Sequence, residues 1–162
     1  MDLERLIERE SEFARRLRPL QPVCAALAAT VVLYEGLAWF LLGPGGVEPP
    51  RLPAAVPLSI TFAAMVLILL SSRLRSGIVR RALPSHPALQ PDPEAVLAAY
   101  RRGTILSFAL LEGAALLGLL VSLLSGRIYY GIVLCLAALA GMLTRWPRAA
   151  EVERILRGRL VL

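Results

Sequence analysis

The chain has 162 residues, of which 57% are hydrophobic, and its mean hydropathy is +0.65. This composition is too apolar for a soluble globular domain, in which apolar residues make up roughly half of the chain. The formal net charge is +6 and all 18 basic residues are arginines. Because these arginines gather at the ends of long apolar stretches, we assign the charge to anionic lipid rather than to nucleic acid.

Residues 1–20 are predicted to form an amphipathic helix that ends at Pro19, with Pro22 in the first turn of the next helix. Its apolar residues recur at helical spacing: Leu3, Leu6, Ile7, Phe13, Ala14 and Leu17. Its opposite face is charged: Glu4, Glu8, Arg9, Glu12, Arg15 and Arg16. Two interpretations stay open, a helix lying on the cytoplasmic leaflet and a helix that binds a protein partner or a second copy.

Four apolar stretches follow, at residues 23–42, 53–72, 103–124 and 128–144. Each approaches or exceeds the ~20 residues needed to cross a ~30 Å hydrocarbon core, and the last is the shortest. The sequence therefore predicts an all-α polytopic membrane protein, a four-helix transmembrane domain over residues 21–144. Short connections between the first and second stretches and between the third and fourth predict two antiparallel hairpins.

The arginines predict the orientation of these helices. They lie before the first stretch, in a loop at 73–102, and in a basic tail at 145–162, and only Arg51 and Arg127 lie elsewhere. The positive-inside rule then places both termini and the 73–102 loop in the cytoplasm. The tail also carries an amphipathic segment with Val152, Ile155 and Leu156.

The 73–102 loop has two parts. Its middle is too rich in proline for regular helix, at Pro84, Pro87 and Pro91. A helix is then predicted to start with Asp92 as N-cap and Pro93 in the first position, and to run into the third apolar stretch. The single histidine, His86, and the two cysteines, which lie inside apolar stretches, predict no metal site, disulfide framework or cofactor. The cysteines are Cys24 and Cys135.

Glu35 and Glu112 are the only charged residues inside the four stretches, and each is followed by glycine. Together with the repeated order of elements, this pattern suggests a parallel 2+2 duplication. At 1.5 Å per residue, Glu112 lies about 13 Å from the inner boundary and Glu35 about 10 Å from the outer one. Their levels then differ by about one turn, so two neighbouring helices would let the carboxyls share a proton.

A carboxylate at bilayer depth is expensive unless it is neutral or paired, which makes both residues candidate functional sites. With no basic residue in the stretches, we expect at least one of them to be protonated at neutral pH. The expected partners are hydroxyls: Thr30, Tyr34, Ser59, Thr61, Ser107 and Ser122. The small residues expected to let helices approach closely are Gly36, Gly113, Gly118, Ala114, Ala137 and Gly141.

Three functions fit these carboxylates: hydrogen bonds that only specify helix packing in an accessory or assembly subunit, binding or relay of a proton or cation, and binding of a lipid headgroup, quinone or other small ligand. No nucleophile–base pair, phosphate loop, metal cluster or dinucleotide fingerprint is present, so an enzyme is not expected. An oligomer formed through the apolar helices is expected in either of the first two cases.

Part of the chain resembles a known family. Gln90-Pro91-Asp92-Pro93-Glu94, then Tyr100-Arg101-Arg102, Ala109-Leu110-Leu111-Glu112-Gly113 and Gly118-Leu119-Leu120-Val121 resemble the carboxylate helix of the ATP synthase proteolipid, the c subunit. This resemblance covers residues 90–124 and implies that Glu112 carries a translocated proton or sodium ion. The whole chain resembles a family of small, uncharacterised four-span proteins of the bacterial inner membrane, through Ala109–Gly113 and Pro147-Arg148.

Overall fold

The structure is a computed structural model, and it describes residues 12–43, 53–83 and 92–156. Every regular element in these ranges is helical. Several predictions lie outside the described residues: the first half of the amphipathic helix, most of the first connection, the proline-rich stretch with His86, and the last residues of the basic tail.

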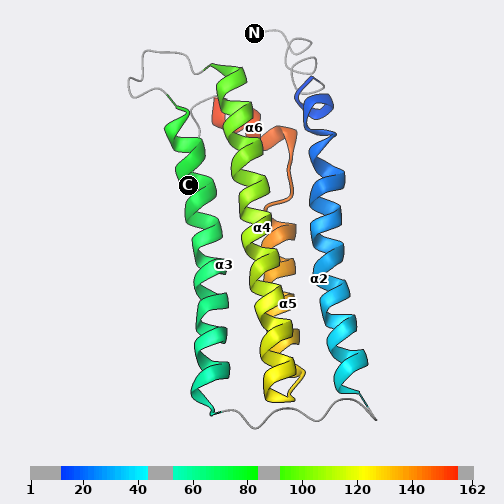
Figure 1. Cartoon of the computed structure of the whole chain (residues 1–162). Coiled ribbons are helices and arrows are strands. Elements are labelled where there is room, and N and C mark those ends of the chain that lie inside the picture. The colour runs from blue at the N-terminus through cyan, green and yellow to red at the C-terminus, as the bar shows by residue number, and fades with distance from the viewer. Residues whose placement is uncertain (1–11, 44–52, 84–91, 157–162) are drawn as a thin grey trace.

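Five helices follow in chain order (Figure 1). They are α2 (Leu20–Leu42), α3 (Ala55–Arg81), α4 (Pro93–Ser125), α5 (Tyr129–Thr144) and α6 (Ala149–Leu156). Three of them, α2, α3 and α4, are long and apolar enough to cross a membrane. With 16 residues, α5 extends only about 24 Å, and it makes a fourth candidate span when it is combined with α6, to which it is bent by 60°.

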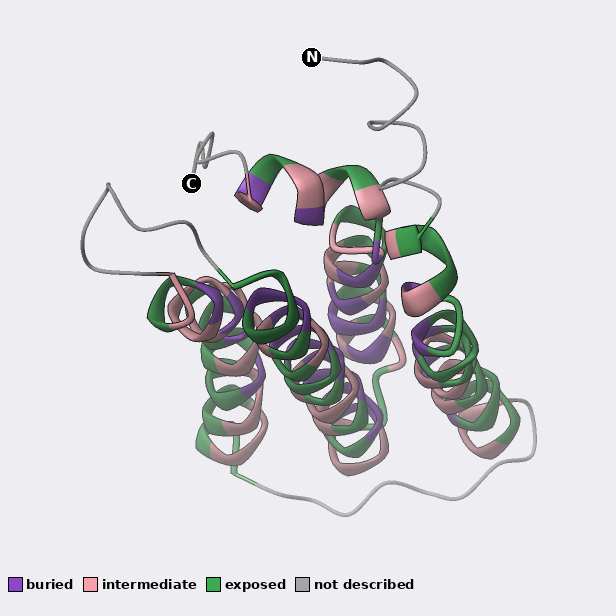
Figure 2. Ribbon diagram, turned by 90° about the horizontal axis from the view of Figure 1, so that it is seen from above, coloured by how far each residue is buried: buried purple, intermediate pink, exposed green. Residues whose placement is uncertain are grey.

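The bundle is organised around α4. In the most apolar 18-residue segment of α4, half of the residues are buried (50%), whereas in the corresponding segments of α2 and α3 only 11% are buried. Helix α4 contacts α2, α3, α5 and α6. The predicted pairing of the first two spans is wrong, because α2 and α3 lie on opposite sides of α4 and do not pack closely together (Figures 1 and 2). The connection from Leu42 to Ala55 has enough residues for another helix to lie between α2 and α3. A direct hairpin was therefore not the only arrangement that its length allowed.

The helix contacts also differ between the two halves of the chain. Helix α4 packs against α5, whereas the corresponding pair, α2 and α3, does not pack. A two-fold duplication would repeat the same contact in both halves, so the packing of the described helices gives the proposed duplication no support.

The predicted 73–102 loop is largely helix. Helix α3 continues to Arg81, well beyond the predicted end of the second span, because Arg75 and Val79 continue its buried face. The start of α4 agrees with the prediction: Asp92 is the N-cap, its side chain accepts a hydrogen bond from the backbone N–H of Glu94 at 3.0 Å, and Pro93 opens the helix. The described part of this loop therefore extends two membrane helices beyond their apolar stretches.

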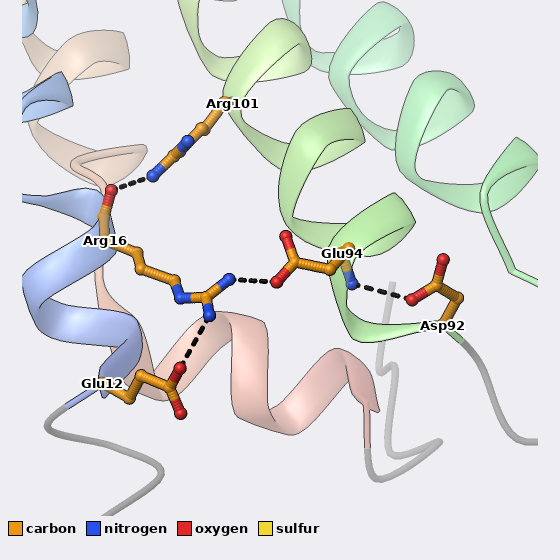
Figure 3. A network of polar contacts seen from close by, with 5 residues as sticks. All are labelled: Glu12, Arg16, Asp92, Glu94 and Arg101. Atoms are coloured by element: carbon orange, nitrogen blue, oxygen red, sulfur yellow. Dashed lines mark hydrogen bonds and ion pairs between the residues drawn. The ribbon is translucent and has the colours of Figure 1, made fainter.

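The N-terminal amphipathic helix packs against the chain itself. Residues 12–17 are helical and Leu17 is buried in the same core as Val96 and Tyr100. Polar contacts lie at the edge of this packing: Arg16 pairs with Glu94 and with Glu12, and Arg101 donates to the Arg16 carbonyl (Figure 3). Of the described apolar face, Leu17 and Phe13 therefore pack into this core, whereas Ala14 stays exposed.

The outer faces of the bundle are apolar. Leu33 and Phe40 of α2 are 68% and 81% exposed, and Phe62 of α3 is 72% exposed (Figure 2 shows the exposed faces in green). Such surfaces are unfavourable in water but match the interior of a bilayer. The long apolar helices and their apolar outer faces together favour a membrane location.

Candidate intramembrane carboxylate site

Glu112 projects from the middle of α4 toward α2, where two hydroxyl groups meet it. Oε1 of Glu112 lies 2.8 Å from Oγ1 of Thr30 and 3.1 Å from the hydroxyl of Tyr34. Thr30 and Tyr34 are four residues apart, so they lie on one face of α2, one above the other. The second oxygen, Oε2, receives no hydrogen bond from the described residues.

The hydrogen bonds around Thr30 suit either protonation state of Glu112. The Thr30 hydroxyl also lies 2.8 Å from the carbonyl oxygen of Leu27, and a hydroxyl has a single proton to donate. When Thr30 donates to Leu27, the proton between Thr30 and Glu112 must come from a neutral Glu112. When Glu112 is ionised, Thr30 and Tyr34 both donate to it.

Glu35 lies in a different environment. Both of its carboxyl oxygens are buried, and neither has a hydrogen-bond partner among the described residues. The side chain reaches the start of α5, where a Cβ atom built on Gly131 would lie 3.2 Å from Oε2 of Glu35. Nearby, Oγ of Ser122 is occupied because it accepts a hydrogen bond from the backbone N–H of Gly131 at 2.8 Å. Glu35 therefore lies against the start of α5, beside the thiol of Cys135, without a hydrogen bond to its oxygens among the described residues.

The two carboxyls do not form one site. Their helices, α2 and α4, are neighbours, as the shared-proton hypothesis requires. However, Glu112 pairs with Thr30 and Tyr34, whereas Glu35 points toward Gly131, farther along the bundle. No hydrogen bond joins them, since both oxygens of Glu35 lack a partner in the described part of the chain.

The glycines expected to allow close helix packing divide into two groups. Gly118 does so, because a Cβ atom there would lie 3.0 Å from Cβ of Leu134 in α5. Gly131, which the sequence did not single out, is tighter still, with Ser122 Oγ at 2.6 Å from the built Cβ atom. Gly36 has no atom within 4 Å of its built Cβ, and Gly113 has only an ordinary contact with Leu67. The Glu-Gly pattern is therefore not a close-packing motif within this chain.

The remaining predicted hydroxyls do not reach a carboxyl. Ser59 and Thr61 donate to carbonyl oxygens of their own helix, those of Val56 and Pro57. Ser107 is fully buried, and its hydroxyl has no partner among the described residues. Of the six candidates, only Thr30 and Tyr34 form a hydrogen bond with a membrane carboxyl among the described residues, and both do so with Glu112.

A second polar cluster, which the sequence analysis missed, lies at the end of the bundle that α6 crosses. Arg75 is only 8% exposed and pairs with Glu151 of α6 at 2.7 Å. The hydroxyl of Tyr100 donates to the same oxygen of Glu151 at 2.7 Å, and the guanidinium of Arg75 lies 5.0 Å from the centre of the Tyr100 ring. Arg145 completes the set by donating to Ser71 at 2.6 Å. The signal available in the sequence was the helical spacing of Ser71, Arg75 and Val79, which continues the buried face of α3.

Comparison with protein-family models, curated proteins and solved structures finds no match to this chain. The class that the fold and the described residues define is an all-helical protein with three, or up to four, candidate membrane-spanning helices.

Proposed function

We propose that this chain is a small integral membrane protein in which Glu112 reversibly binds a proton or a monovalent cation. The observation that carries the proposal is the meeting of Thr30 and Tyr34 of α2 with Oε1 of Glu112 in α4. A carboxyl with two hydroxyl partners can lose its proton within a helix bundle at a lower cost than one without a donor. Thr30 donates to Oε1 when Glu112 is ionised and accepts its proton when Glu112 is neutral and Thr30 donates to Leu27, so this contact serves both states.

The same atoms suit a hard cation. Oε1 of Glu112, the two hydroxyls and the Leu27 carbonyl oxygen give oxygen ligands from two helices, and oxygen is the ligand type that hard cations prefer. Both oxygens of Glu35 are buried without a hydrogen bond among the described residues, so its neutral form is the one that fits its surroundings. We therefore assign exchange to Glu112 and a proton-holding role to Glu35.

The arrangement in the membrane is part of the same proposal. Helices α2, α3, α4 and α5 would each cross the bilayer, with the ends near Leu20, Arg81, Pro93 and Thr144 in the cytoplasm of a bacterial cell. The support for this orientation is the concentration of arginines at that end, and α5 would rely on Arg145 and Trp146 at its end to compensate for its short length.

Flux through proteoliposomes tests the proposal. Purified wild-type protein, Glu112→Gln and Glu35→Gln would be reconstituted, and the decay of an imposed proton or sodium gradient would be followed with an entrapped dye. We expect Glu112→Gln to abolish flux, because an amide keeps the hydrogen bonds but cannot ionise. Flux that is unchanged by Glu112→Gln would contradict the proposal.

A second function is favoured by the same contact, because Glu112, Thr30 and Tyr34 join α2 to α4. In this account the chain is an accessory or assembly subunit, and the carboxyl only specifies helix packing. Glu112→Gln would then keep the oligomeric state and the partners, and Glu112→Leu would lose them. Size-exclusion chromatography of both variants in mild detergent separates the two accounts.

A further inference from the structure

Arg145, at the end of α5, has no acidic partner in the ion pairs found in residues 12–43, 53–83 and 92–156. It is half-buried, and its NH1 group donates to Oγ of Ser71 in α3 at 2.6 Å. Ser71 in turn donates to the carbonyl oxygen of Ile68 at 2.6 Å. The guanidinium is thus fixed between α3 and α5 by a neutral partner, with one of its five N–H donors used among the described residues.

The nearby acidic residue serves a different arginine. Glu151 pairs with Arg75 at 2.7 Å, and none of the three ion pairs found among the described residues includes Arg145. Burial and then the nearby charge of Arg75 lower the pKa of Arg145. An arginine does not lose its proton in proteins, so a half-buried guanidinium beside a second one calls for an anion.

The depth of Arg145 suggests where this anion comes from. Ser71 lies one residue before the end of the second apolar stretch, and Arg145 lies one residue after the end of the fourth. The next residue, Trp146, packs edge-on against Phe108 with 6.3 Å between ring centres, and tryptophan is enriched at the membrane–water interface. Lipid phosphates lie at this level, and basic pockets between membrane helices bind anionic headgroups.

Exposed apolar side chains lie on both helices that hold Arg145. Leu69 and Leu70 of α3 are within two residues of Ser71, and Leu143 of α5 is two residues before Arg145. A phospholipid placed with its phosphate at Arg145 would therefore lay its chains on apolar side chains. Free phosphate would use only the guanidinium and would leave these side chains uncovered.

We propose that Arg145, held in place by Ser71 of α3, binds the phosphate of an anionic phospholipid at the cytoplasmic end of α5. The site is separate from Glu112 and does not depend on the function proposed for it. The lipid neutralises Arg145, and it connects α3 to α5 next to the contact between Arg75 and Glu151.

Native mass spectrometry of the full chain tests this proposal. Wild-type protein, Arg145→Gln and Arg148→Gln would be purified in neutral detergent with equal amounts of phosphatidylglycerol and phosphatidylcholine. Arg148 is the matched control, because it is exposed and lies three residues after Arg145, in the connection between α5 and α6. We expect the wild type to retain phosphatidylglycerol, Arg145→Gln to retain about tenfold less, as the loss of a charge-assisted hydrogen bond implies, and Arg148→Gln to behave as the wild type.

Equal retention of the two lipids by the wild type would overturn the proposal, and so would equal losses in the two variants, which would indicate non-specific attraction. Protection of the wild type from thermal unfolding by inorganic phosphate, without any preference for phosphatidylglycerol, would show that free phosphate is the ligand and would also overturn it. If Arg145→Gln does not fold by circular dichroism, Arg145→Lys replaces it. Lysine keeps the charge but not the planar donor group. Arg145→Lys should therefore retain less phosphatidylglycerol than the wild type does, but more than a protein without any preference for this lipid.

Discussion

The hydroxyl oxygen of Thr30 lies 2.8 Å from Oε1 of Glu112 and also 2.8 Å from the carbonyl oxygen of Leu27. Its single proton can be donated to either oxygen. Rotation of this hydroxyl therefore changes which group supplies the proton between Thr30 and Glu112. Helix α2 thus provides a contact that is maintained whether Glu112 is neutral or charged, and this contact is also a polar cross-link between two membrane helices.

Thr30→Val keeps the shape of the side chain and removes the hydroxyl. We expect the free energy of unfolding to fall by about 1 kcal/mol, within the range measured for polar contacts between membrane helices. Thr61→Val is the matched control, because Thr61 donates only to Pro57 of its own helix. Unfolding in sodium dodecyl sulfate, followed by circular dichroism, measures both changes, and equal effects would show that the contact with Glu112 contributes nothing.

Glu35→Leu and Glu112→Leu should have opposite effects on stability. Glu35 has two buried oxygens without partners in the described part of the structure, and replacing an unsatisfied polar group with an apolar one is neutral or stabilising. Glu112→Leu removes two hydrogen bonds and should lower the free energy of unfolding by about 1–2 kcal/mol. The same unfolding assay applies, and a large loss in Glu35→Leu would mean that Glu35 has a partner outside the described residues.

Gly131→Ala should destabilise the bundle by about 1–3 kcal/mol, as overpacking of a core does. The new Cβ atom would lie 2.6 Å from Ser122 Oγ and 3.3 Å from the backbone oxygen of Gly118, so α4 and α5 would have to separate. Gly36→Ala is the control, because nothing lies within 4 Å of its built Cβ atom and alanine is the better helix former by up to about 1 kcal/mol. Thermal unfolding of both variants should therefore give shifts of opposite sign, and two shifts of the same sign would contradict the packing described here.

Leu17→Ala should lower the free energy of unfolding by about 2–5 kcal/mol, as for other buried leucines, because Leu17 is 2% exposed in the core. Glu94→Gln breaks the exposed ion pair with Arg16 (Figure 3) and should have a much smaller effect, because water and salt screen such pairs. Limited proteolysis near residues 12–20 reports whether the helix is released. Cleavage that increases in Glu94→Gln but not in Leu17→Ala would show that the ion pair, and not the apolar face, holds this segment.

The sequence predicted the elements but not all of their neighbours. Apolar length located α2, α3 and α4, and the Asp92-Pro93 pair located the start of α4, because these features act within a few residues of chain. That α4 separates α2 from α3 depends on side-chain fit among several helices. Local pattern carries no information about such fit, and the assumption of hairpins failed at this point.

The candidate site was predicted in the same partial way. The sequence shows an acidic residue in an apolar stretch, and it shows Thr30 and Tyr34 as possible partners. That both pair with Glu112 rather than with Glu35 depends on the rotation of α2 about its axis. The cluster around Arg75 was missed because charged residues beyond an apolar stretch were expected to be solvated. Arg75 is instead buried, since Glu151 and Tyr100 of two other helices meet it there.

The most direct test of the account is an infrared titration of the carboxyl groups in proteoliposomes, with wild type, Glu112→Gln and Glu35→Gln compared. Ten other acidic residues also titrate, so the quantity compared is the difference between each variant and the wild type. The account predicts that Glu112→Gln removes one reversible component of the protonated-carboxyl band and that Glu35→Gln removes none. A reversible band in Glu112→Gln that is identical to that of the wild type would contradict the claim that Glu112 exchanges a proton within the membrane.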